Sequence, residues 1–161
     1  MNKKVLVIIV LIIVLALIIG VVFFTSNKDK NIQINIEELA SEISESGAFE
    51  DQLIKVDSEM TMSDYGFTKD EVKSIVSYQG SGATSEEIVI LELNDKSNLN
   101  SVKEKINTRI TERKEAFTSY LPKEVGKIDN NIMKVKGKYV IFCISNDSNK
   151  VNNAINEVVN R

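Results

Sequence analysis

The first apolar stretch of the chain covers residues 5–24, from Val5 to Phe24. None of these 20 positions carries a charge, an amide or a hydroxyl. At a rise of about 1.5 Å per residue, a helix of this length spans about 30 Å, which matches the hydrocarbon layer of a bilayer. A buried helix of a soluble domain would normally show a polar face, and this segment shows none. The pattern therefore predicts a transmembrane helix.

A cleaved signal peptide is the main alternative for this segment. The apolar region of a signal peptide normally covers about 7–15 residues and ends at a small-x-small cleavage site. The run here is longer, it ends with the bulky Phe24, and no Cys follows it as a point of lipid attachment. An uncleaved anchor is therefore the preferred interpretation.

Positive charges flank the apolar segment unevenly. Lys3 and Lys4 lie close to the α-amino group on one side, whereas Lys28 and Lys30 on the other side are separated by Asp29. By the positive-inside rule, residues 1–4 are predicted to form a cytoplasmic tail and the chain after residue 24 to lie outside the cell membrane. The reverse topology, with the domain in the cytosol, remains open.

A polar tether over residues 25–33 is predicted to lead into one domain over residues 34–161. Helical patterns cover residues 36–46, 97–120 and 149–160, and extended patterns cover residues 72–79, 86–93, 132–136 and 138–145. Residues 53–67, from Leu53 to Phe67, fit no single pattern, although a short helix ending at Gly66 is one interpretation. The predicted fold is α+β in the order α-β-β-α-β-β-α. It has an antiparallel sheet of about four strands, with helices mainly on one face.

Composition excludes several kinds of chemistry. The chain has no His and a single Cys, so His-based catalysis, His/Cys zinc or copper sites and an intrachain disulfide are ruled out. It holds 20 Lys and Arg against 23 Asp and Glu, and without Lys3 and Lys4 the balance beyond the apolar segment is 18 against 23, or −5. An acidic domain without a basic stripe is a poor match for nucleic acid.

Three segments together resemble a bacterial family known only as domain of unknown function 4358. They are Glu87-Ile88-Val89-Ile90 after a Gly/Ser/Ala loop, a helix that carries Arg113 and ends Tyr120-Leu121-Pro122, and Gly137-Lys138-Tyr139-Val140-Ile141. The resemblance implies an exported or membrane-tethered protein, often a lipoprotein. This chain has the apolar segment without the lipoprotein Cys, so its attachment differs. The family supplies no reaction, ligand or catalytic residue.

Arg113 is the most informative residue of the longest predicted helix. The apolar positions of that helix fall within an arc of about 80°; they are Leu99, Val102, Ile106, Ile110, Phe117 and Tyr120. Arg113 falls inside the arc, and a guanidinium held there needs a carboxylate or backbone carbonyls. The prediction is a structural ion pair with an acid of residues 57–64 or of a strand, Glu92 being one candidate. The alternative is a cationic subsite for a carboxylate or phosphate ligand.

Other candidate groups have structural interpretations. Gly80-Ser81-Gly82 lacks the helix and the Lys-Ser/Thr pair that follow a phosphate-binding loop, and it is predicted to be a flexible connection. Six acids are predicted to be solvated surface charge: Glu86, Glu87, Glu92, Asp57, Glu59 and Asp64. Cys143 has no activating His and is predicted to be buried. The sequence thus predicts no catalytic residue, no metal site and no cofactor.

These observations lead to a prediction about function. We expect a single-pass membrane protein that presents a non-enzymatic binding or scaffolding domain at the cell envelope, where its partner is an envelope protein or cell-wall material. One alternative is a carboxylate-dependent cell-wall hydrolase, which would need two acids in a cleft and a raised pKa. Another is a ligand-sensing ectodomain that acts through a partner, because a tail of four residues cannot signal alone.

Overall fold

A computed structural model describes residues 32–159 of the protein. The predicted anchor over residues 5–24 and most of the predicted tether lie outside the described residues. From Ile34 onward the chain forms one compact unit. Within residues 32–159, no helix combines the length and the apolar character that crossing a membrane would require.

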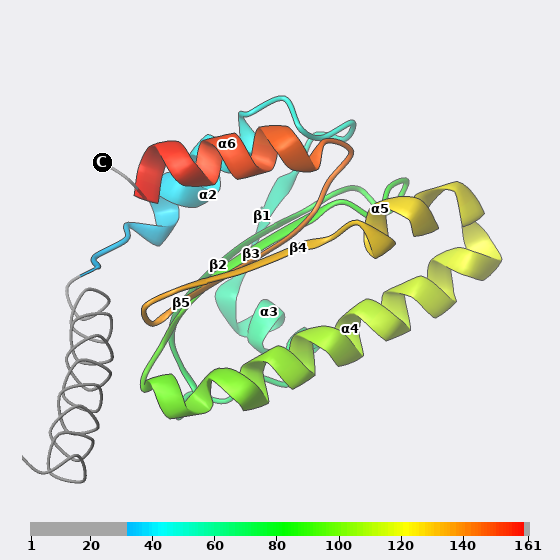
Figure 1. Ribbon diagram of the computed structural model, residues 1–161. Coiled ribbons are helices and arrows are strands. Elements are labelled where there is room, and N and C mark those ends of the chain that lie inside the picture. The colour runs from blue at the N-terminus through cyan, green and yellow to red at the C-terminus, as the bar shows by residue number, and fades with distance from the viewer. Residues whose placement is uncertain (1–31, 160–161) are drawn as a thin grey trace, which may run out of the picture. The chain divides into compact units, whose positions relative to one another are not determined.

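Five antiparallel strands form one sheet in the order β1-β2-β3-β5-β4 (Figure 1). They are β1 (Ile54–Val56), β2 (Val72–Gln79), β3 (Glu87–Leu93), β4 (Ile132–Lys136) and β5 (Tyr139–Ile144). Every residue of β5 is buried, as expected for the most hydrophobic strand at an inner position. The four longer strands confirm the sequence prediction, and Gly137 closes the predicted β4–β5 hairpin with a φ of +60°.

Five α-helices accompany the sheet in the described part of the chain. They are α2 (Ile36–Ser44), α3 (Ser58–Tyr65), α4 (Leu99–Tyr120), α5 (Val125–Asp129) and α6 (Ser148–Val159). The Asn35 side chain caps α2 by accepting the N–H groups of Glu37 and Glu38. The helices α2, α4 and α6 confirm the three predicted helices, whereas α5 was not predicted.

The helices cover both faces of the sheet, so the prediction that they lie mainly on one face is wrong (Figure 1). On one face, α2 and α6 pack on Ile88, Ile90 and Ile141. On the other, α3, α4 and α5 cover Val89 and Val140. The physical reason is that β3 and β5 are apolar on both sides, and each side needs its own cover.

The unassigned residues 53–67 contain the edge strand β1 and the helix α3. The Asp57 side chain caps α3 by accepting the N–H groups of Glu59 and Met60, and Gly66 ends the helix in the left-handed region. Only Thr61 and Tyr65 of α3 are buried. Because one buried contact is a hydroxyl, bonded to the Ser77 hydroxyl at 2.5 Å, the helix has no apolar stripe that its sequence could reveal.

Candidate ligand-binding cleft

A polar cleft of about 810 Å³ opens where β4 begins and β5 ends. Glu50 lines it from the loop before β1, and Ser145 and Asn146 line it from the end of β5. The residues that line it from α5 and its flanks are Lys123, Glu124, Gly126, Lys127 and residues 129–131. The lining groups are mostly amides, hydroxyls and charged side chains. The cleft therefore suits a polar ligand better than an apolar one.

Local sequence places α5 beside the cleft. Pro122 follows the end of α4 and starts a 3₁₀ turn, Pro122–Glu124, which leads directly into α5. Ile128 is fully buried in the core and fixes one side of α5. Glu124 and Lys127 are three residues apart, so they share another side of this short helical segment.

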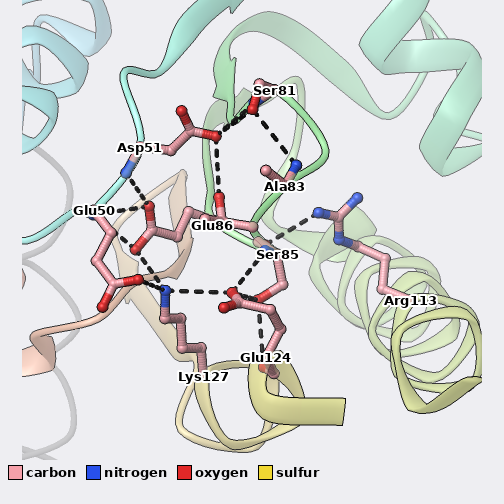
Figure 2. Close-up of polar contacts among 10 residues, drawn as sticks. Glu50, Asp51, Ser81, Ala83, Ser85, Glu86, Arg113, Glu124 and Lys127 are labelled. Carbon is pink, nitrogen blue, oxygen red and sulfur yellow. Dashed lines mark hydrogen bonds and ion pairs between the residues drawn. The ribbon is translucent and has the colours of Figure 1, made fainter. Parts of the chain in front are cut away.

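Lys127 lines the cleft, and its ammonium contacts three carboxylates (Figure 2). Its Nζ atom is 2.9 Å from Glu50, 3.2 Å from Glu86 and 3.3 Å from Glu124. Burial tends to lower the pKa of Lys127, but the carboxylates outweigh it and the pKa is raised above its ordinary value. Lys127 therefore stays charged and occupies the space between the acids.

Two of these acids also bind backbone groups. The Glu86 carboxylate accepts the N–H groups of Glu50 and Asp51 at about 2.9–3.0 Å, which holds this loop against the start of β3. Glu124 accepts the N–H of Ser85 at 3.0 Å. Burial alone would raise the pKa of Glu124, but the bonds from Ser85 and Lys127 lower it overall. The Glu124 carboxylate is thus an ionised hydrogen-bond acceptor.

Asp51 organises the loop between β2 and β3. Its Oδ2 atom accepts the Ser81 N–H at 2.7 Å and the Ser81 hydroxyl at 2.8 Å, and these bonds lower the pKa of Asp51 (Figure 2). A Cβ at Gly80 would lie 2.9 Å from the same carboxylate oxygen and 2.7 Å from the Thr84 hydroxyl, so a larger residue there would displace these side chains. Gly80 thus lies at a close approach of two loops, whereas Gly82 has open space at its Cβ position and a φ of +90°.

Arg113 lies beside this network, away from the cleft. Its Nη2 donates to the Ser85 carbonyl at 3.1 Å, its Nε is 3.4 Å from Glu87 Oε2, and its guanidinium stacks on Phe117 at 5.3 Å. The partner of Arg113 is thus a strand acid, but it is not Glu92, which binds Lys73 at 2.9 Å. Ser85 connects Arg113 to the cleft, because its N–H binds Glu124 and its carbonyl binds Arg113.

The family comparison adds to this geometry. The family described as Domain of unknown function (DUF4358) matches residues 45–145. The chain belongs to this family. The match runs from the end of α2 to Ser145, so the DUF4358 region holds all five strands and most of the cleft lining. No curated protein and no solved structure matches the chain.

Two acids that were predicted to be solvated are buried in this DUF4358 domain. Glu86 and Glu87 are fully buried, so the prediction of solvated surface charge is wrong for both. The reason is that they open the inner strand β3, where a carboxylate needs a cation, and Lys127 and Arg113 supply one each. Glu59, in contrast, has a side chain that is 82% exposed.

Sequence reasoning missed Glu124 and Lys127. The signal that could have found them is a Glu–Lys pair with i,i+3 spacing directly after Pro122, opposite two unexplained acids at the start of an apolar strand. Cys143 is buried and unbridged, as predicted, and burial raises the pKa of its thiol. Within residues 32–159, no group of three His, Cys, Asp or Glu side chains could hold a metal ion.

Proposed function

We propose that this DUF4358 protein is a single-pass membrane protein that presents a non-enzymatic binding domain at the outer side of the cell membrane. The polar cleft beside Lys127 is its ligand site, and this cleft is the observation that carries the proposal. Asn130, Asn131 and Asn146 are among the residues that line it. These groups suit a polar component of the envelope.

The charge state of the cleft favours binding over hydrolysis. A carboxylate-dependent hydrolase needs one acid that stays protonated, and such an acid has a raised pKa. The pKa of Glu124 is lowered, and its carboxylate is held by Ser85 and Lys127. Glu50 and Glu86 contact the same ammonium. This arrangement supports a fixed recognition surface.

The anchor in this proposal is the segment from Val5 to Phe24, with residues 1–4 in the cytoplasm. The tether of residues 25–33 has nine positions, which reach at most about 30 Å when extended. The domain would therefore stay close to the membrane surface. Its ligands would be molecules found there, such as membrane proteins or cell-wall material.

Thiol labelling of intact cells tests the anchor and its orientation. Cys143 is buried, so a Ser26→Cys variant places one accessible thiol next to the predicted membrane surface. We expect an impermeant thiol reagent to label it in intact cells. Labelling only after lysis would show the reverse topology, and a shortened protein in the growth medium would show a cleaved signal peptide.

Site-specific photocrosslinking tests the cleft. A photoreactive residue at Asn146, an exposed residue of the cleft lining, should give a discrete adduct in native membranes. The matched control is Thr108, an exposed position on α4 outside the cleft lining. Adducts of equal yield at both positions, or none at Asn146, would contradict a ligand site in the cleft.

A further inference from the structure

The lysines on the two sides of the sheet differ in whether they have a carboxylate partner. On the β1 side, Lys55 binds Glu37 at 2.6 Å and Lys73 of β2 binds Glu92 at 2.9 Å. On β4, at the other edge, Lys134 and Lys136 form no hydrogen bond and no ion pair with any residue of 32–159. Both side chains are partly buried. In a domain of net negative charge, two partly buried lysines without a carboxylate are unusual.

The backbone of β4 is also open on its outer side. No strand of the described chain pairs with β4 except β5 (Figure 1). The hairpin turn Gly137-Lys138 makes Lys136 and Tyr139 a mutually hydrogen-bonded pair, and such pairs alternate along an antiparallel ladder. Lys134 and Ile132 therefore bond to β5, whereas the N–H and C=O groups of Met133 and Val135 point outward.

Side chains of β4 alternate in the same way. Ile132 packs in the core under α2 and α6, so Lys134 and Lys136 lie on that face of the strand. Met133 and Val135 pack against the core on the opposite face. An added strand would thus meet two free backbone positions in the middle and two positive charges on one face.

We propose that the outer edge of β4 binds an extended acidic segment of a partner protein as a sixth strand. Acidic side chains at alternate positions of that segment lie opposite Lys134 and Lys136, and its backbone bonds to Met133 and Val135. A second copy of this chain fits less well. Antiparallel pairing of two β4 strands about Lys134 would place equal charges directly opposite each other.

Binding of a designed peptide to the full-length protein in nanodiscs tests this proposal. The probe is Thr-Glu-Val-Glu-Val-Glu-Thr, and the matched peptide carries Gln in place of each Glu. We expect the acidic peptide to bind at least tenfold more tightly and to slow amide exchange at Met133 and Val135. Equal binding of the two peptides, or no binding at all, would overturn the proposal. The role of the two lysines would then be to prevent the edge strand from pairing with other chains.

Two variants locate the binding site. The double variant Lys134→Gln, Lys136→Gln should reduce affinity for the acidic peptide at least tenfold. The control Lys69→Gln, Lys96→Gln removes two exposed lysines that lie outside both β4 and the cleft lining, and it should leave affinity unchanged. If both double variants reduce peptide affinity equally, the peptide is attracted by lysines in general, and a binding site on β4 is refuted.

Val135→Pro tests the backbone contribution. It removes an N–H that points away from β5, so pairing with β5 should survive while peptide binding is lost. Circular dichroism checks that the variant folds. If it does not, the peptide affinity of the Lys134→Gln, Lys136→Gln variant tests the proposal. Concentration-dependent dimers that Val135→Pro abolishes would show self-pairing of β4 and overturn the proposal.

Discussion

Lys127 and Arg113 are two partly buried cations near the start of β3, and their surroundings differ. Lys127, 11% exposed, contacts three carboxylates, whereas Arg113, 16% exposed, contacts one carboxylate, one carbonyl and one aromatic ring. Around Arg113, the Nε atom, Glu87 Oε2 and the Tyr65 hydroxyl are buried without a hydrogen-bond partner in residues 32–159.

This difference indicates different tasks. An ammonium is a compact donor of three hydrogen bonds, and Lys127 uses that capacity to join Glu50, Glu86 and Glu124, which come from three separate segments. Arg113 neutralises one buried acid and packs on Phe117. We therefore expect the shape of the cleft to depend on Lys127 far more than on Arg113.

Lys127→Met should have the largest effect. It leaves Glu86 and Glu124 buried without their cation, and breaking a buried ion pair by removing one partner costs about 3–5 kcal/mol. Urea denaturation of the full-length protein in mild detergent measures the free energy of unfolding. The control Lys114→Met removes an exposed pair with Asp129 and should cost less than about 1 kcal/mol. Equal losses would mean that Lys127 does not organise the cleft.

Sequence patterns predicted the core of the fold but not the cleft. The apolar runs of β3 and β5 and the periodicity of α4 and α6 are local signals, and the position of Arg113 inside an apolar arc correctly marked it as needing a partner. Lys127 lies in a helix of five residues, too short for a period, and Glu50 is 77 residues away from it. Contacts of that separation depend on tertiary packing, which no local pattern encodes.

A third ion pair provides a reference for the comparison of Lys127 with Arg113, and its contribution can be measured at acidic pH. Lys105 Nζ binds Glu71 at 2.6 Å. Burial would raise the pKa of Glu71, but bonds from Lys105, Ser101 and Thr68 lower it from 4.5 to about 2. A lowered folded pKa stabilises the fold above pH 4.5, and the gain is lost as pH falls toward 2.

The Glu71→Gln variant isolates this contribution. At about 1.4 kcal/mol per pKa unit, it should lose about 3 kcal/mol at pH 7 and almost nothing near pH 2. Urea denaturation between pH 2 and pH 7 measures the convergence of the two proteins. Parallel curves across that range would refute a linked titration of Glu71.

Glu86→Gln and Glu87→Gln compare the two buried acids directly. Glu86 accepts two backbone N–H groups, and an amide there would turn a donor toward a donor, so we expect a loss of about 2–3 kcal/mol. At Glu87, Oε1 accepts a hydrogen bond from Gln79, so the amide nitrogen of the variant would replace Oε2 and face Arg113 Nε, 3.4 Å away. Only this one donor is opposed, so we expect a smaller loss of about 1–2 kcal/mol. A larger loss of stability in Glu87→Gln than in Glu86→Gln would show that the acid paired with Arg113 contributes more than the acid paired with Lys127.

Tyr65→Phe should have the smallest effect and is the most direct test of the Arg113 region. Burial and the nearby Glu87 carboxylate raise the pKa of Tyr65 well above its ordinary value, so its hydroxyl stays neutral. Removing a buried hydroxyl that has no partner leaves no group unsatisfied, so stability should change by less than about 0.5 kcal/mol or rise slightly. The control Thr61→Val removes a hydroxyl bonded to Ser77 and to the Asp57 carbonyl, and should cost about 1–2 kcal/mol.

The Tyr65→Phe result decides whether the two cation sites truly differ. A loss above about 1 kcal/mol would mean that the hydroxyl donates to Glu87, which would leave only Arg113 Nε of these three groups without a hydrogen-bond partner in residues 32–159. A neutral result in Tyr65→Phe, together with a clear loss in Thr61→Val, would show that Arg113 tolerates unmet hydrogen bonds where Lys127 has none. Lys127, which also lines the cleft, would then contribute more to the stability of the domain than Arg113 does.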